Sequence, residues 1–328
     1  MKAALLVEPG KVEIRDVPAP SPGRGEVLVR IKQAGICGTD YALFLGRLGA
    51  KLPLIPGHEG VGEIAAPGPG VKDLRIGDRV TIQPNFSCGK CPPCLMGREN
   101  VCLNKVRLGL DVNGVFAEYV TVPRKYLWPL PEDLSYSVAA LTEPLSVALH
   151  AFSKNPPSPG ERVLVYGAGV IGLMLVQLVA LAKGRVTAFD IAEPRLEVAT
   201  KLGAEKTFCS LPELEKEAGS FSIVYETSGI AEAFSQIIGL CAPAGRIVLT
   251  GLPERDFPVF TSSLVRKELT VLGSMIYRDE FPAAIDLLKR GEMNTGLFIS
   301  EIHPLDELPQ ALEDFRSPSR VKTLIRIP

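Results

Sequence analysis

The sequence has little of what a membrane-embedded or nucleic-acid-binding protein needs. Over 328 residues the formal net charge is only −1, so no basic surplus exists to attract DNA, RNA or an acidic membrane surface. The longest apolar run, VIGLMLVQLVALA at 170–182, is too short to cross a bilayer. Histidines number three, so few positions can offer an imidazole to a metal. We therefore expect small-molecule partners, with no nucleic acid and no membrane.

A secretory signal is also lacking. The first sixteen residues, MKAALLVEPGKVEIRD, place charges and a Pro-Gly turn where such a signal would need its apolar core. We expect a cytoplasmic protein, and in a reducing cytoplasm clustered cysteines indicate metal binding rather than disulfides. Asparagine and glutamine are sparse while prolines number 28, a weak indication of a thermophilic source.

The length predicts two domains, and the pattern of segments changes near residue 150. Before that point, short β segments alternate with Gly/Pro turns, which is typical of a β-rich, barrel-like domain. The expected strands are 2–7, 12–17, 26–35, 61–68, 79–84 and 116–123. We assign residues 1–150 to this domain, with a cysteine lobe at about 85–105.

Beyond residue 150, β segments alternate with helical ones, which predicts a parallel, doubly wound sheet and an α/β fold. The expected strands are 162–167, 185–190, 222–229, 245–252 and 269–274, and the expected helices are 170–183, 193–203 and 231–240. We assign residues 151–288 to this domain. Residues 289–328 contain a strand, a helix and a last strand, and periodicity alone does not show where they pack.

The segment VYGAGVIG has the glycine spacing of a dinucleotide-binding turn, at Gly167, Gly169 and Gly172. It follows an apolar strand and opens a helix, so Val170 and Ile171 supply first-turn N–H groups for a pyrophosphate. Asp190 ends the next strand, where a carboxylate accepts the ribose hydroxyls and repels a 2′-phosphate. NAD is favoured over NADP, although Arg195 keeps NADP possible. The alternative is a glycine turn that merely packs.

The segment SCGKCPPCLMGRENVC places four cysteines, Cys88, Cys91, Cys94 and Cys102, at a spacing suited to zinc. Four thiolates complete a tetrahedral shell and leave no position for a substrate. We therefore interpret this cluster as a structural zinc site, the alternative being free thiols on a loop.

A second set of metal-binding residue types is dispersed along the first domain: Cys37, His58, Glu59 and Glu143. A Cys, a His and a carboxylate can bind zinc and leave its fourth position open for water or substrate. Cys37 and His58 stand between glycines at expected strand ends, which favours exposed chemistry. A lone His or Cys is more often structural, and the residues alone leave both interpretations open.

In order along the chain, GICGTD, PGHEGVGEI, the four-cysteine lobe, GVFAEYV, EPLSVALHA and VYGAGVIG resemble the zinc-dependent medium-chain alcohol dehydrogenase family. The resemblance covers essentially the whole chain. EPLSVALHA and SLVRKELTVLGS are most similar to its branch of polyol (sorbitol and sugar-alcohol) and threonine dehydrogenases. It implies a GroES-like catalytic domain, a Rossmann domain and a C-terminal return to the first domain.

The resemblance also implies two zinc ions per chain, one catalytic on Cys37, His58 and Glu59, with Glu143 close by or exchanging in. Thr39 matches the hydroxyl that takes the substrate proton. Gly251 and Leu252 match the strand end that lies against the nicotinamide, and Thr227 is a further candidate cofactor contact. Many relatives carry a proton-relay His where this chain has Ala42, so water, another group or direct opening to solvent must replace it.

We thus expect reversible NAD-linked oxidation of a secondary alcohol, most consistent with a polyol, sugar alcohol or related sugar derivative, by a homo-oligomer (tetramer or dimer). A threonine 3-dehydrogenase-like or sugar-acid dehydrogenase activity is the alternative. A zinc-ribbon binding module would explain the four cysteines but not the glycine fingerprint. A metal-free quinone or enoyl reductase would share the fold but have no use for Cys37, His58 and Glu143.

Overall fold

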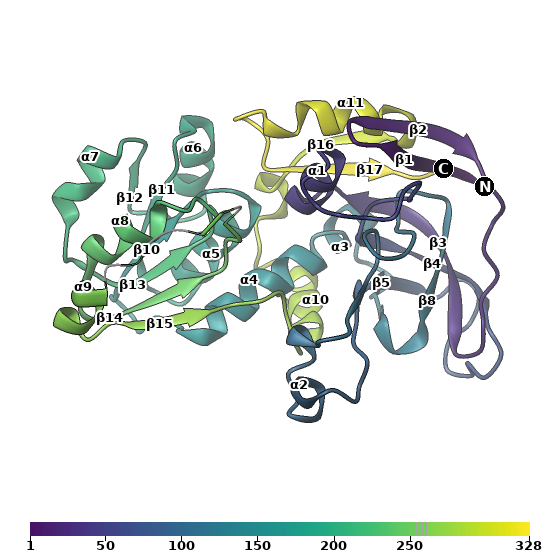
Figure 1. Cartoon of the computed structure of the whole chain (residues 1–328), viewed down its shortest axis with the longest axis horizontal. Helices are drawn as coiled ribbons and strands as arrows, with labels where there is room; N and C mark the ends of the chain where they lie inside the picture. Colours follow the sequence, from purple (N-terminus) through teal and green to yellow (C-terminus); the bar gives the residue numbers. More distant parts are fainter. Residues whose placement is uncertain (254, 257–258, 260) are drawn as a thin grey trace. The chain divides into compact units, whose positions relative to one another are not determined.

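The chain divides into two compact units, each with its own core (Figure 1). A computed structural model describes residues 1–253, 255–256, 259 and 261–328. Unit 1 comprises Met1–Glu143 and Phe281–Pro328, and unit 2 comprises Pro144–Glu280. Among the described residues, no helix has the length and apolar character needed to cross a membrane.

Unit 1 is built around a mostly antiparallel seven-stranded sheet with the order β16-β17-β3-β4-β5-β9. The seventh strand, β8, pairs with Glu26–Arg30 of β3, whereas β17 pairs with Gln33–Gly35 of the same strand. The strands of unit 1, including the two small sheets β1-β2 and β6-β7, are β1 Lys2–Glu8, β2 Lys11–Asp16, β3 Glu26–Gly35, β4 Glu59–Pro67, β5 Arg79–Ile82, β6 Asn85–Phe86, β7 Val106–Arg107, β8 Tyr119–Pro123, β9 Leu127–Pro129, β16 Ile299–Pro304 and β17 Lys322–Arg326. Its helices are α1 Gly38–Phe44, α2 Pro92–Leu95, α3 Tyr136–Ala139, α10 Phe281–Lys289 and α11 Leu308–Glu313.

The long strand β3 shows why this sheet forms. In its sequence EVLVRIKQAG, the β-branched residues Val27, Val29 and Ile31 are fully buried, and they alternate with the less buried Leu28 and Arg30. This period of two places one face of the strand on the core. β17 pairs antiparallel with β3, so the C-terminal segment completes the sheet of unit 1.

Unit 2 contains a six-stranded parallel sheet with the order β12-β11-β10-β13-β14-β15, which confirms the predicted doubly wound architecture. Its strands are β10 Arg162–Tyr166, β11 Arg185–Phe189, β12 Lys206–Phe208, β13 Phe221–Glu226, β14 Cys241–Leu249 and β15 Thr270–Gly273. Its helices are α5 Val170–Leu181, α6 Glu193–Lys201, α7 Leu211–Leu214, α8 Ala233–Leu240 and α9 Thr261–Lys267, while α4 Thr142–Lys154 begins in unit 1 and continues here.

The strand order reverses between β10 and β13. In an open parallel sheet, ligands bind at the carboxyl ends of the strands beside such a switch point. β10 is buried along Val163, Leu164 and Val165, as expected for a central strand covered on both faces.

The unit boundaries fall at 143/144 and 280/281, whereas the sequence analysis placed them at 150/151 and 288/289. α4 has no break in its helical pattern at the boundary, so periodicity cannot divide it. α10 follows unit 2 without a change of composition, yet it packs against α3 of unit 1. Both differences arise because tertiary contacts, not local sequence, assign these helices.

Candidate metal and cofactor sites

The four cysteines of the predicted structural site lie together in unit 1. One sulfur from each of Cys88, Cys91, Cys94 and Cys102 lies within 4.8 Å of the others, and all four are free thiols. Cys91 Sγ is 3.4 Å from Cys94 Sγ and 3.8 Å from Cys102 Sγ. These separations bring four sulfurs to one point, as a tetrahedral zinc site requires.

The pKa values of these thiols show what the lobe favours. Backbone N–H groups of Lys90 and Cys91 lower the pKa of Cys88 to about 6, which favours a thiolate. Burial and the neighbouring thiols raise the pKa of Cys94 to about 12. Four thiolates could coexist here if a cation offset their charge, and a zinc ion would supply that charge.

The second predicted cluster also comes together. Cys37, His58 and Glu59 each place a ligand atom within 4.8 Å of the others. Cys37 follows β3 and is the N-cap residue of α1, while Glu59 opens β4 beside Gly35 of β3. Pairing of β3 with β4 thus brings residues from two loops to one end of the sheet. His58 and Glu59 are buried, and Cys37 is partly accessible.

Asp40 connects the two loops, and the sequence analysis did not identify it. Its carboxylate accepts hydrogen bonds from the backbone N–H of Cys37 (2.8 Å) and Gly57 (3.2 Å). The same carboxylate lies 3.2 Å from Nδ1 of His58, although that nitrogen is not aligned for a hydrogen bond. A carboxylate behind a ligand histidine orients the ring toward a metal. The motif GTD contained this signal, because an acid three residues after an N-cap commonly bonds back to it.

His58 has an environment that attracts cations. Burial lowers its pKa, but the negative charges of Asp40 and Cys37 outweigh burial and raise the pKa well above its usual value. The charges that attract a proton to this ring also attract a metal ion. The donor set of one thiol, one imidazole and one carboxylate fits zinc with an open fourth position.

Lys322 is the second residue that sequence reasoning missed. This β17 lysine is 2% exposed, forms an ion pair with Oε2 of Glu59, and donates a 2.9 Å hydrogen bond to the carbonyl of Ile36. Burial lowers its pKa, but Glu59, Cys37 and Glu143 together raise it. No local signal marks this lysine, since it lies 286 residues from Ile36.

Glu143 and Thr39 occupy different places around this cluster. Glu143 is buried and close enough to raise the pKa of Lys322, but it is not one of the three residues whose ligand atoms group together. Thr39 lies in the first turn of α1, two residues after Cys37, and is half-buried.

In unit 2 the glycine fingerprint forms the turn between β10 and α5. Gly167 has φ of +103°, which other residues rarely adopt. A side chain at Gly172 would begin 1.8 Å from the carbonyl oxygen of Gly167, so the third glycine is needed for the helix to approach the strand. Gly169 is the N-cap of α5 and offers no side-chain cap. The N–H groups at Val170 and Ile171 are therefore not competed for by a capping side chain when a phosphate binds.

Asp190 directly follows β11 at the same edge of the sheet and is nearly buried. Its two carboxylate oxygens accept hydrogen bonds from the N–H of Ala168 (2.7 Å) and Ala192 (2.9 Å). Each oxygen retains a further acceptor site for a ribose hydroxyl. Nη1 of Arg195 lies 3.9 Å from Asp190, and its Nε is buried without a hydrogen-bond partner among the described residues.

The other predicted cofactor residues end neighbouring strands. Thr227 follows β13, and its hydroxyl donates a 2.8 Å hydrogen bond to the carbonyl of Gly167. Gly251 lies shortly after β14, where an added Cβ would be 2.2 Å from the backbone nitrogen of Gly229. Leu252 is 75% exposed. Parallel strands therefore bring the fingerprint, Asp190, Thr227 and Gly251 to one edge.

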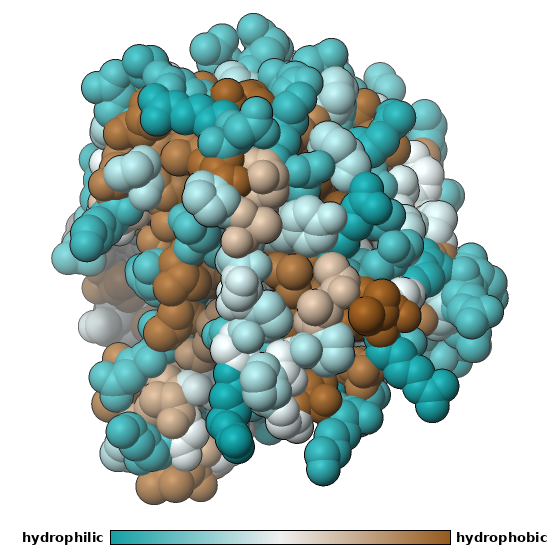
Figure 2. Space-filling model, turned by 90° about the vertical axis from the view of Figure 1, so that its right-hand side faces the viewer, coloured by the Kyte–Doolittle hydropathy of each residue, from teal (hydrophilic) through white to brown (hydrophobic). Residues whose placement is uncertain are grey.

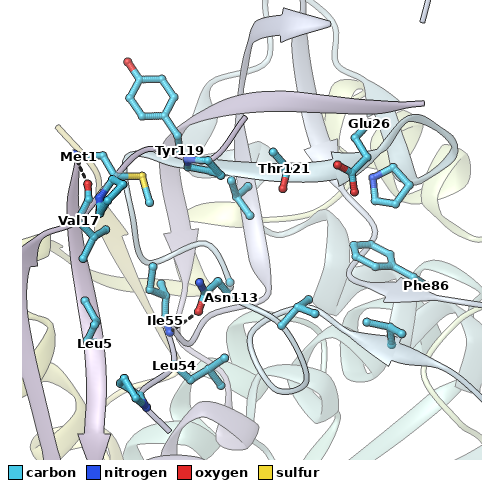
Figure 3. Close-up of a pocket in the computed structure, with 18 residues that line it drawn as sticks. Met1, Leu5, Val17, Glu26, Leu54, Ile55, Phe86, Asn113, Tyr119 and Thr121 are labelled. Carbon is cyan, nitrogen blue, oxygen red and sulfur yellow. Dashed lines mark hydrogen bonds between the residues drawn. The ribbon is translucent and has the colours of Figure 1, made fainter. Parts of the chain in front are cut away.

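A cavity of about 630 Å³ lies elsewhere in unit 1 (Figure 3). It is mostly apolar, and none of the predicted site residues lines it. Asn113, labelled in Figure 3, points into this region and accepts a hydrogen bond from the backbone of Ile55. The face of the molecule seen in Figure 2 carries hydrophobic patches among polar residues. The described residues that line the cavity include one acid, Glu26, and no histidine, cysteine or lysine.

A glycine-rich turn at a switch point, in the same chain as a Cys–His–Glu cluster and a four-cysteine lobe, defines a class of proteins. That class is the dinucleotide-dependent dehydrogenases whose catalytic domain binds metal.

Comparison with known proteins identifies the family within this class. The family descriptions "Alcohol dehydrogenase GroES-like domain" and "Zinc-binding dehydrogenase" match residues 23–132 and 170–290. The chain belongs to the zinc-dependent medium-chain alcohol dehydrogenase family and is an oxidoreductase of it. This confirms the resemblance and the predicted combination of a GroES-like and a Rossmann domain.

Two relatives and two solved structures show the extent of the similarity. Sorbitol dehydrogenase of Bacillus subtilis (strain 168) is 30% identical, over 95% of this chain and 93% of its own. L-threonine 3-dehydrogenase of Streptomyces coelicolor is 38% identical, over 83% of each chain. The rspB alcohol dehydrogenase of Escherichia coli CFT073, complexed with NADH, has a TM-score of 0.93 at 33% identity and 99% coverage of both chains. A zinc-binding dehydrogenase structure from Sinorhizobium meliloti 1021, bound to NADP, has a TM-score of 0.94 at 34% identity, with 99% and 98% coverage.

Proposed function

We propose that this chain catalyses the reversible, NAD-linked oxidation of a secondary alcohol to a ketone, with a polyol, sugar alcohol or related sugar derivative as substrate. It would use two zinc ions per chain, one catalytic and one structural. The observation that carries the proposal is the grouping of Cys37 with the buried His58 and Glu59, in two loops that Asp40 holds together.

The residues of this group have separable roles. Cys37, His58 and Glu59 would hold a zinc ion, which supplies the Lewis acidity that lowers the pKa of a substrate hydroxyl. Thr39 would accept the proton that this hydroxyl loses. Because Ala42 cannot relay it, Thr39 would pass the proton to a water molecule or directly to bulk solvent. Asp40 orients the ring of His58. Glu143 acts from outside the three-residue group, through water or by exchanging in.

The candidate cofactor residues lie along the carboxyl edge of the sheet in unit 2, where a bound dinucleotide would supply the hydride acceptor. Asp190 supports NAD, since a carboxylate there repels a 2′-phosphate. Arg195 lies beside Asp190 and could pair with the 2′-phosphate of NADP. The two similar structures contain NADH in one case and NADP in the other. We expect kcat/KM with NAD to exceed that with NADP. Equal or better use of NADP would contradict the role given to Asp190.

The substrate class rests on relatives, since sorbitol dehydrogenase is among them. L-threonine is the second candidate because L-threonine 3-dehydrogenase is 38% identical over 83% of the chain. A panel of polyols, sugar phosphates, sugar acids and threonine, followed by NADH absorbance, tests both. Turnover of none of these, in protein with two zinc ions per chain, would refute the proposed substrate class.

Metal analysis of variants tests the ligand assignment. Glu59→Ala should lose one zinc ion per chain, whereas Glu143→Ala should keep both and turn over about 10–100-fold more slowly.

Thr39→Val should keep both zinc ions and bind NAD normally, yet slow the proton-coupled step by roughly 100-fold. A Cys37→Ala protein that lost one zinc but kept full activity would refute the scheme.

We also propose that the protein is a cytoplasmic homo-oligomer. Seven free cysteines, five of them proposed as zinc ligands, are suited to a reducing compartment. Support for self-association comes from β15, which stands at the end of the strand order of the parallel sheet as described. An edge strand presents unpaired backbone groups that a second copy can pair.

A further inference from the structure

Glu226 is a buried acid in unit 2 for which the chemistry above has no use. It is the last residue of β13 and is 4% exposed. β13 lies between β10 and β14 and is one of the two strands at which the order of the sheet reverses. A carboxyl group is costly to bury, and burial raises the pKa of Glu226. Its retention at the switch point therefore calls for a reason.

The side chain of Glu226 organises the loop that follows its own strand. One carboxylate oxygen accepts hydrogen bonds from the N–H of Ser228 (2.7 Å), the hydroxyl of Ser228 and the N–H of Gly229 (3.0 Å). Three donors on one oxygen hold loop 227–230 in a tight turn around the carboxylate.

The same residue also fixes the loop that follows β14. The backbone carbonyl of Glu226 accepts hydrogen bonds from the N–H of Thr250 (2.9 Å) and Gly251 (3.1 Å). The contact between the loops is close, because a Cβ added at Gly251 would lie 2.2 Å from the nitrogen of Gly229 and 2.6 Å from Oε2 of Glu226. The backbone of Glu226 is therefore bonded to the loop after β14, and its carboxylate contacts the backbone of Gly251 in that loop as well.

Thr227 extends this connection to the glycine fingerprint. Its N–H donates to the carbonyl of Tyr166 (2.9 Å), and its hydroxyl donates to the carbonyl of Gly167 (2.8 Å). The ends of β10, β13 and β14 are thus joined through two consecutive residues. Asp190 marks the adenosine side of the sheet, so the ends of β13 and β14 lie on the side left for the nicotinamide half of a dinucleotide.

We propose that Glu226 is a positioning residue that holds loops 227–230 and 250–252 in place before cofactor binds, and so pre-organises the nicotinamide half of the dinucleotide site. The proposal rests on the dinucleotide-dependent function proposed above. The length of the side chain matters more than its charge in this role, because the N–H and hydroxyl donors of the loop need an acceptor oxygen at a fixed point. The lost affinity of a variant measures the fraction of molecules whose loops are correctly placed.

The experiment compares NADH with AMP, which carries the adenosine half alone, by calorimetry on the zinc-loaded full chain. Glu226→Ala removes the acceptor, and Glu226→Asp keeps the charge but withdraws it by one methylene. Both should weaken NADH binding by about 10-fold or more, with AMP affinity unchanged within about two-fold. Glu226→Gln keeps the reach and should stay within about three-fold of wild type for NADH. Glu217→Gln, on the ion pairs with Arg162 and Lys206, is the matched control.

Equal weakening of NADH and AMP, or no weakening in the Ala and Asp variants, would overturn the proposal. If Glu226→Ala fails to fold, hydrogen exchange on the wild type decides instead. The amides of Ser228, Gly229 and Gly251 should be protected before NADH is added, and protection that develops only with NADH would refute pre-organisation. A wild type that binds neither NADH nor NADPH would refute the proposed function and leave the exchange test of the loops in place.

Discussion

Lys322 places an ammonium group within the cluster of metal-ligand candidates in unit 1. Its side chain and that of Glu59 are each 1% exposed, so solvent screens neither charge. A buried ion pair contributes little over an apolar pair, but removing one partner is costly because the other charge is left uncompensated. Lys322 is therefore one counter-ion of Glu59, and the proposed zinc ion would be a second.

Lys322→Met tests this dual compensation. After chelation of zinc, the variant should be about 3–5 kcal/mol less stable than wild type, since Glu59 is then buried without a cation. Added zinc should recover most of the loss, so the zinc-induced rise in Tm should be larger in the variant than in wild type. Thermal unfolding with and without zinc measures both values.

Lys32→Met is the matched control for Lys322→Met, because Lys32 pairs with Glu63 at 3.2 Å in a more exposed position. It should leave the response to zinc unchanged. An equal zinc-induced shift in Lys322→Met and wild type would show that Lys322 does not share Glu59 with the metal.

At the scale of elements, the four-cysteine lobe is a short segment with little regular structure of its own. α2 contains four residues, and β6 and β7 contain two each. Exposed apolar side chains on the lobe include Leu95, Met96 and Leu103, at 75%, 69% and 72% exposure. With so few side chains buried, we expect the lobe to depend on its sulfurs for order, which the proposed zinc ion would supply.

Cys91→Ser should therefore reduce the zinc content from two ions to one per chain and lower Tm, while protein that stays folded retains its turnover. Cys209→Ser, at an exposed thiol outside both clusters, should change neither quantity. A well-folded Cys91→Ser protein with its other zinc bound and no activity would show that the lobe takes part in catalysis.

β16 carries a pH-sensitive charge cluster. His303 hydrogen-bonds to Glu307 (2.7 Å) and Glu301 (3.0 Å), and Glu301 also pairs with Arg320 at 2.8 Å. Hydrogen bonds to Glu301 and Glu307 raise the pKa of His303. A histidine with a raised pKa stabilises the fold fully below its unfolded value of about 6.5, and this contribution disappears as pH rises through the folded value.

His303→Gln should remove that contribution. The Tm difference between wild type and variant should be largest near pH 6 and fall as the pH rises above about 6.5. The effect should be below about 1 kcal/mol, because His303 is a partly exposed surface group. Thermal unfolding across this range measures it, and a difference that grew with pH would have the wrong sign.

At the scale of the whole molecule, a substitution on the edge strand β15 tests the proposed self-association. Thr270 is exposed on this strand, and a lysine on an edge strand disfavours pairing with a second copy. Light scattering after gel filtration should report an oligomer for wild type and a smaller species for Thr270→Lys. Ser262→Lys, at an exposed position of α9 nearby in sequence, should leave the size unchanged. A monomeric wild type would refute the proposed oligomer.

The features that the sequence alone determined are those whose chemistry lies in short segments. The spacing of the four cysteines brings their sulfurs together because a single loop of 88–102 closes on itself. The glycines of 167–172 specify their turn because φ and close packing at those positions are local requirements. Alternating strands and helices in the second half likewise predict a parallel sheet, since each connection spans only tens of residues.

The features that only tertiary structure decided depend on contacts between distant segments. Lys322 reaches the carbonyl of Ile36 across 286 residues because β17 pairs with β3, and no pattern near residue 322 announces that pairing. Glu59 joins the three-residue group while Glu143 does not. The residue types alone do not decide which of these two carboxylates lies beside Cys37 and His58. Glu226 acquires its significance from the loop after β14, which pairing of two parallel strands brings to it. Local spacing determines which groups can bind a metal or a phosphate, whereas strand pairing determines which charges and donors surround them.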